Sequence, residues 1–114
     1  MNTTISFDPV VVDLENAAWT PWSKPGAEGR VKLFNSNGKR LRLLELPAGF
    51  DEQHWCTTGH QGYVFEGSFT IVFDDSAWEC RPGMAFSIPD GKRHRSRGAS
   101  DSRTVVFVVD ALVA

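Results

Sequence analysis

Hydrophobic and polar positions along the chain alternate in short runs, and turn-forming residues separate these runs. The runs have the length of strands and recur about every eight to twelve residues without a helical period, which is typical of a β-sandwich or barrel. The predicted strands are Arg30–Phe34, Arg40–Leu46, Gln53–Thr57, Tyr63–Phe65, Phe69–Phe73, Trp78–Cys80, Ala85–Ile88, Arg93–Arg97 and Arg103–Asp110. We therefore predict an all-β protein built as an antiparallel β-barrel.

Two turn signals refine this picture. Asn37-Gly38 separates the first two predicted strands, and an Asn-Gly pair in that position is typical of a tight β-hairpin. The stretch 20–26 holds two prolines and a glycine, which oppose both a helix and a central strand, so we expect a loop there. We divide the single domain into an N-terminal strand and loop, residues 1–29, that pack on a barrel formed by residues 30–114.

Composition narrows the class of protein. The chain has 114 residues, of which 41% are hydrophobic and 23% charged, as in an ordinary globular domain. Its net charge of −2, with both signs mixed along the chain, gives no basic surface for nucleic acid. The longest apolar run, 104–109, is too short to cross a bilayer. Residues 1–5 lack the features of a signal peptide, so we expect a cytoplasmic protein.

The chain contains three histidines and two cysteines, and strand alternation predicts the direction of three of these five side chains. His54 and Cys56 are two positions apart, so in a strand they would share a face. In the segment 93–97 three arginines alternate with His94 and Ser96, which favours arginines in solvent and His94 inside. The other cysteine, Cys80, stands before a Pro-Gly turn, and we expect it to pack in the core or at an edge rather than form a disulfide.

The segment 83–94 resembles one of the two sequence motifs of the cupin superfamily. That motif is Gly, five residues, Pro-x-Gly, two residues, His, and this chain matches every fixed position with Gly83, Pro89, Gly91 and His94. The resemblance extends over about residues 30 to 110, which implies a double-stranded β-helix, the jelly roll of cupins.

The segment 49–67 resembles the other cupin motif, with changes at the ligand positions. Gly67 fixes the register, and six residues separate it from His60, which stands where the family has a glutamate ligand. Cys56 stands at the second histidine position of the motif, and His54 stands at the first. The resemblance therefore implies one divalent transition metal ion (zinc, iron, nickel or copper) with His54, Cys56, His60 and His94 as its ligands.

The role of Cys56 stays open at this point. As a thiolate it would complete a tetrahedral set with three histidines, which favours zinc or copper and could close the site. As a small apolar residue beside the ion it would leave open positions on a three-histidine site, as catalytic sites require.

The resemblance is compatible with three functions. The first is a metal-dependent enzyme that acts on a small polar metabolite, as an oxidoreductase of the dioxygenase type, an isomerase or a lyase. The second is a non-catalytic cupin module that binds or senses a metal or metabolite; a metal-free barrel for an apolar ligand is a third. The sequence identifies no catalytic residue, since Glu52, Gln61 and Tyr63 are near the ligands only in sequence. We expect a small-molecule ligand, no nucleic-acid or membrane partner, and a homodimer, because small cupins pair through edge strands.

Overall fold

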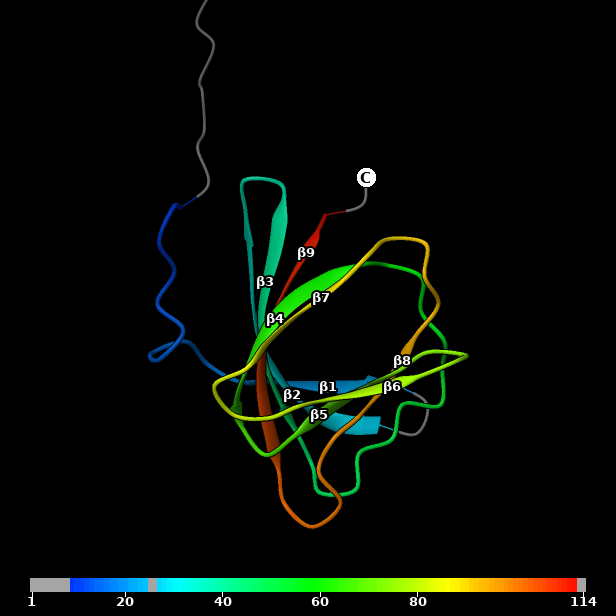
Figure 1. Ribbon diagram of the computed structural model, residues 1–114. Coiled ribbons are helices and arrows are strands. Elements are labelled where there is room, and N and C mark those ends of the chain that lie inside the picture. The colour runs from blue at the N-terminus through cyan, green and yellow to red at the C-terminus, as the bar shows by residue number, and fades with distance from the viewer. Residues whose placement is uncertain (1–8, 25–26, 113–114) are drawn as a thin grey trace, which may run out of the picture.

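The computed structural model describes residues 9–24 and 27–112, and it confirms the all-β prediction (Figure 1). The strands are β1 (Thr20–Lys24), β2 (Ala27–Ser36), β3 (Lys39–Leu46), β4 (His60–Glu66), β5 (Phe69–Val72), β6 (Ala77–Cys80), β7 (Ala85–Ile88), β8 (Arg95–Arg97) and β9 (Thr104–Ala111). Within the described ranges there is no helix, and hence none of the length and hydrophobicity needed to cross a membrane.

The strands form two antiparallel sheets in a jelly-roll arrangement. The larger sheet has the order β1-β2-β3-β9-β4-β7, and the smaller has the order β6-β5-β8. The last strand, β9, lies between β3 and β4, and Figure 1 shows it in red beside them. The apolar core between the strands consists of Val31, Leu44, Leu46, Phe50, Val64, Phe69, Ile71, Cys80, Ile88, Val106 and Val108. The expected packing of Cys80 in the core is confirmed.

The hairpin between β2 and β3 confirms the prediction made from Asn37-Gly38. Ser36 pairs with Lys39, so the loop has two residues, with φ angles of 51° at Asn37 and 78° at Gly38. Two positive φ angles are those of a type I′ turn, whose twist matches that of the flanking strands.

The stretch 20–26 differs from the predicted loop. Thr20–Lys24 form β1, which pairs with β2 at the edge of the larger sheet. An edge strand tolerates Pro21 because one side of the strand needs no hydrogen-bond donor. Pro25, Gly26 and the first eight residues of the predicted N-terminal segment lie outside the described residues.

Alternation along β4 decides which side chains reach the interior. Val64 is completely buried, and His60 lies on the same side of the strand. Tyr63 and Phe65 lie on the opposite side of the strand, where they are 38% and 57% exposed and contact each other. The side of β4 away from His60 is therefore an exposed surface of the sheet.

The segments on either side of the candidate site only partly match the predicted strands. Residues 53–57 do not form a strand; Cys56 alone makes an isolated bridge, with His94. β8 is shorter than predicted. His94 lies inside as predicted, at 1% exposed, and Arg93 and Arg97 are exposed, whereas Arg95 is partly buried beside Asp51. The loop carrying Cys56 is therefore fixed by backbone pairing to the residue before β8.

Candidate metal centre

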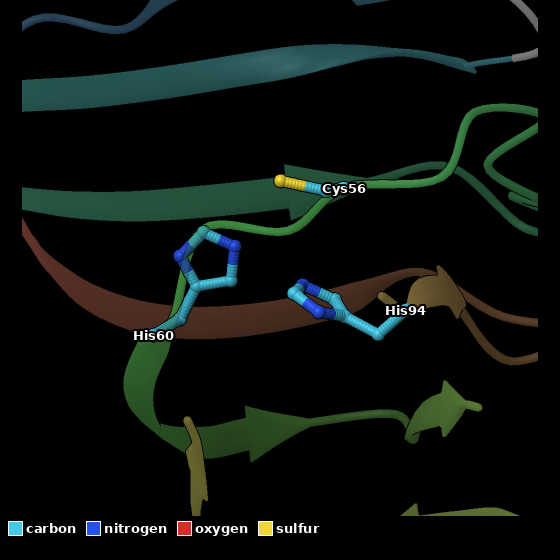
Figure 2. A group of neighbouring side chains, drawn as sticks. All are labelled: Cys56, His60 and His94. Carbon is cyan, nitrogen blue, oxygen red and sulfur yellow. The ribbon is translucent and has the colours of Figure 1, made fainter. Parts of the chain in front are cut away.

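Three of the four predicted ligands converge in the barrel. One ligand atom from each of Cys56, His60 and His94 lies within 4.8 Å of the other two, and Figure 2 shows these side chains pointing toward a common space. Cys56 comes from the loop before β4, His60 begins β4, and His94 precedes β8. Two backbone hydrogen bonds of 2.8 Å between Cys56 and His94 hold two of the three segments together.

The imidazole of His94 has a fixed orientation and one unused nitrogen. Its Nδ1 lies 2.9 Å from the backbone carbonyl oxygen of Lys92. A carbonyl oxygen can only accept, so Nδ1 carries the proton and Nε2 presents a lone pair. In the described part of the chain, this buried Nε2 has no hydrogen-bond partner. A buried polar atom without a partner costs about 1–3 kcal/mol, and a bound cation would remove that cost.

Asp110, at the end of β9, sets the orientation of His60 in a similar way. The His60 Nδ1 lies 3.1 Å from Oδ2 of the completely buried Asp110 carboxylate, so Nδ1 donates to the carboxylate and Nε2 is left with a lone pair. Burial lowers the pKa of His60 to about 4, although the charge of Asp110 opposes the shift. The ring is therefore neutral at pH 7, as a metal-binding imidazole must be. A carboxylate behind a histidine ligand is a common support in metal sites.

Asp110 also binds two arginines of β3. Arg40 donates to both of its carboxylate oxygens, at 2.9 and 2.5 Å, and Nη2 of Arg42 lies 3.2 Å from Oδ2. Burial alone would raise the pKa of Asp110, but the hydrogen bond from Arg40 and the charges of Arg42 and Arg40 outweigh burial and lower it. Asp110 is thus a charged carboxylate that organises one wall of the site.

The chemistry of the three donors fits a divalent transition metal ion. A sulfur and two imidazole nitrogens are ligands of zinc and copper. With bonds of about 2.0–2.3 Å, two donors of one ion lie at most about 4.6 Å apart. The three ligand atoms here all lie within 4.8 Å of one another. The backbone N–H of Thr58 donates a hydrogen bond to the Cys56 sulfur at 3.4 Å.

The three donors line a cavity that leaves room for a small ligand. Its volume is about 90 Å³. Polar and charged residues line one part, including Arg40, Arg42 and Glu52, while Trp22, Leu44, Leu46, Phe50, Phe69, Phe86 and Val108 line the remainder. The arrangement can therefore hold an ion with a small molecule beside it.

The remaining residues singled out from the sequence lie in different places. His54 is exposed and lies outside the group of three donors, because residues 53–57 lack the strand alternation that would have placed it beside Cys56. Gln61 and Tyr63 are exposed on the outer side. Glu52 is buried, at 7% exposed, and lines the cavity.

Sequence reasoning missed Asp110, Arg40 and Arg42. Strand alternation could have identified the two arginines, because Arg40 and Arg42 lie on the same face of β3 as Leu44 and Leu46. Asp110 likewise shares the face of three buried residues of β9, Thr104, Val106 and Val108. Charged residues in the inward register of a buried strand point to a functional or structural network.

Solved structures with similar folds identify the fold of this chain. No family model and no curated protein sequence matches the chain. Three solved structures with similar folds come from bacteria. A cupin-like protein from Thermotoga maritima has a TM-score of 0.72 at 17% identity, over 90% of this chain and 83% of that one. The polyketide cyclase RemF from Streptomyces resistomycificus has a TM-score of 0.71 at 24% identity, over 89% and 78%. KdgF from Halomonas sp. has a TM-score of 0.69 at 18% identity, over 96% of each chain.

These similarities place the chain in a structural class. It has the cupin fold, and the resemblance inferred from the two motifs is confirmed at the level of the fold.

Proposed function

We propose that the protein binds one divalent transition metal ion through Cys56, His60 and His94 and acts as a metal-dependent enzyme on a small molecule. The observation that carries this proposal is the buried Nε2 of His94, which has a lone pair but no hydrogen-bond partner among the described residues. The Cys56 sulfur and a His60 nitrogen lie within 4.8 Å of it.

A free coordination position beside the three donors supports an enzyme rather than a binding module with a closed metal site. Three protein donors leave a coordination position free, and catalytic sites require such a position. His54, the fourth donor expected from the sequence, is exposed and outside the group. A cavity of about 90 Å³ adjoins the three donors and can receive the ligand.

The residues around the donors would each have a separate role in catalysis. A bound ion would supply Lewis-acid polarisation of a substrate oxygen. Asp110 and the Lys92 carbonyl hold the two imidazole rings in the orientation that presents a nitrogen to the cavity. Glu52 is a cavity-lining carboxylate and is our candidate for proton transfer. The similarly folded RemF is a polyketide cyclase, which supports an enzyme on this fold. The expected enzyme is, as proposed from the sequence, an oxidoreductase, an isomerase or a lyase.

Metal content tests the proposal. Protein loaded with excess zinc, iron, nickel or copper and then desalted should retain about one ion per chain by mass spectrometry. His94→Ala should lose most of it and also lose the thermal stabilisation that bound metal gives, about 2.7 kcal/mol at 100 times the dissociation constant.

His54→Ala is the matched control, because this histidine is exposed and outside the group. It should retain metal like the wild type. Wild-type protein that retains no ion after desalting would refute the proposal, and loss of metal in His54→Ala would assign a fourth ligand. The cytoplasmic location and the homodimer expected from the sequence stay predictions.

A further inference from the structure

Arg42 is a buried cation whose hydrogen-bonding capacity is not fully used. It lies on the inward face of β3, and only 10% of its side chain is exposed. Its Nη2 reaches Asp110 at 3.2 Å, but its buried Nε has no hydrogen-bond partner within the part of the chain that the structure describes. Leaving such a donor unpaired is costly, more so when the group is charged.

The carboxylate that serves Arg42 is shared with two other groups. Oδ2 of Asp110 also accepts from Arg40, at 2.5 Å, and lies 3.1 Å from His60 Nδ1. Arg40 donates to both carboxylate oxygens, at 2.9 and 2.5 Å, whereas the contact of Arg42 is longer, at 3.2 Å. Burial lowers the pKa of Arg42, as expected for a cation that has lost water without full replacement.

Arg42 faces the same cavity as the three metal donors. Along β3 the cavity wall changes from charged to apolar, because Arg40 and Arg42 are followed on the same face by Leu44 and Leu46. A ligand that is complementary to this wall has an anionic end beside the arginines and an apolar end beside the leucines. The volume of about 90 Å³ corresponds to roughly three water molecules in the liquid, so the ligand is small.

Charge counting favours a single negative charge. The two guanidinium groups are balanced by Asp110 and by the cavity-lining Glu52. A divalent ion bound with Cys56 as a thiolate leaves one positive charge in excess. A planar carboxylate offers that charge and two oxygens that match the N–H groups of a guanidinium.

We propose that the cavity binds a small organic monocarboxylate, with its carboxylate on the Arg42 Nε and its apolar end against Leu44 and Leu46. This inference rests on the proposed function for its metal, and names the substrate class of that site. Arg42 is the residue that selects for the negative charge.

Propionate and propionamide are a matched pair of probes, since they have the same shape and differ in charge. In calorimetric titration of the zinc-loaded protein, propionate should bind with a dissociation constant on the order of millimolar, as expected for five non-hydrogen atoms. Propionamide should bind at least tenfold more weakly, and chloride at the same ionic strength should not replace propionate.

Arg42→Met should weaken propionate binding tenfold or more while the zinc content stays at the wild-type level. Arg42→Lys keeps the positive charge but lacks the planar guanidinium group. Its affinity for propionate should therefore lie between those of the wild type and Arg42→Met. The control is Arg97→Met, which removes an exposed arginine outside the cavity and should bind propionate like the wild type.

Two results would overturn the inference: equal binding of the two probes by the wild type, or wild-type propionate binding by zinc-loaded Arg42→Met. The first comparison needs no variant, so it decides even if Arg42→Met fails to fold. A titration of metal-free protein separates this inference from the proposed function. Propionate selectivity there would support the arginine site even if the chain retained no metal.

Discussion

The sulfur of Cys56 distinguishes this site from one built of imidazoles alone. A thiolate bound to cobalt gives an intense charge-transfer band in the near ultraviolet, so cobalt-substituted protein should show one. Cys56→Ser should abolish the band and weaken metal binding, because an alcohol is a far poorer ligand than a thiolate. Absorption spectroscopy during a cobalt titration measures both effects.

Cys80→Ser is the control for that experiment, because Cys80 is buried in the core away from the three donors. It should lose some stability but keep the band. Cys56→His should still bind metal, since it restores an imidazole at the same place. Cobalt bound without the band, together with unchanged affinity in Cys56→Ala, would mean that Cys56 only packs beside the ion.

The Asp110 carboxylate should matter for stability as well as for the site. Asp110→Asn removes the charge that compensates the buried Arg42 and the partly buried Arg40. Breaking a buried pair by removing one partner typically costs about 3–5 kcal/mol, and we expect the free energy of unfolding in urea to fall by about 3 kcal/mol.

Glu66→Gln provides the comparison, because it removes a carboxylate from an exposed ion pair with Arg103 at 3.0 Å. Exposed pairs contribute about 0–1 kcal/mol, so this variant should stay near the wild type. If Asp110→Asn changed stability as little as Glu66→Gln, Arg40 and Arg42 would not depend on Asp110.

At the scale of elements, the turn between β4 and β5 depends on Gly67. Its φ is +77°, and a Cβ added there would lie 2.4 Å from the carbonyl oxygen of Arg103. Gly38, in the β2–β3 hairpin, has a similar φ of +78° but no atom within 4 Å of the added Cβ. Gly38→Ala should therefore cost only the conformational penalty, about 1–2 kcal/mol.

Gly67→Ala should cost clearly more, since the backbone must shift as well, by about 1–3 kcal/mol for overpacking of this kind. Urea unfolding of both variants measures the difference. Equal losses would show that the turn relaxes without strain around the new methyl group.

The sequence predicted the elements better than it predicted the site. The β2–β3 hairpin and β7 were correct because local chemistry fixes them: Asn37-Gly38 selects the turn, and strand-length runs lie between turn residues. The strand predicted for residues 53–57, which would have placed His54 beside Cys56, was wrong because this segment is held by one backbone bridge at Cys56 rather than by a ladder. Asp110 could not be placed because Val105 to Val109 are all apolar, which hides the inward face of β9.

At the scale of the whole molecule, the open edges of the sheets are the feature that bears on assembly. β1 and β7 end the larger sheet, and unpaired edges favour association with another chain. We therefore expect a homodimer, with a mass of twice 12.7 kDa in light scattering at tens of micromolar. A monomeric mass at that concentration would contradict this prediction.

The central place of β9 in the larger sheet has a consequence for how the chain is made. During synthesis β3 and β4 leave the ribosome before β9, yet it is β9 that lies between them. Pairing across such sequence distances is slow, so the sheet can close only after translation has passed this strand. Asp110 is near the end of β9, so a nascent chain interrupted before β9 would lack both the strand that joins the two halves of the sheet and the support for His60. A premature stop near residue 104 would therefore leave an unfolded chain open to proteolysis, rather than a smaller barrel with a weaker site.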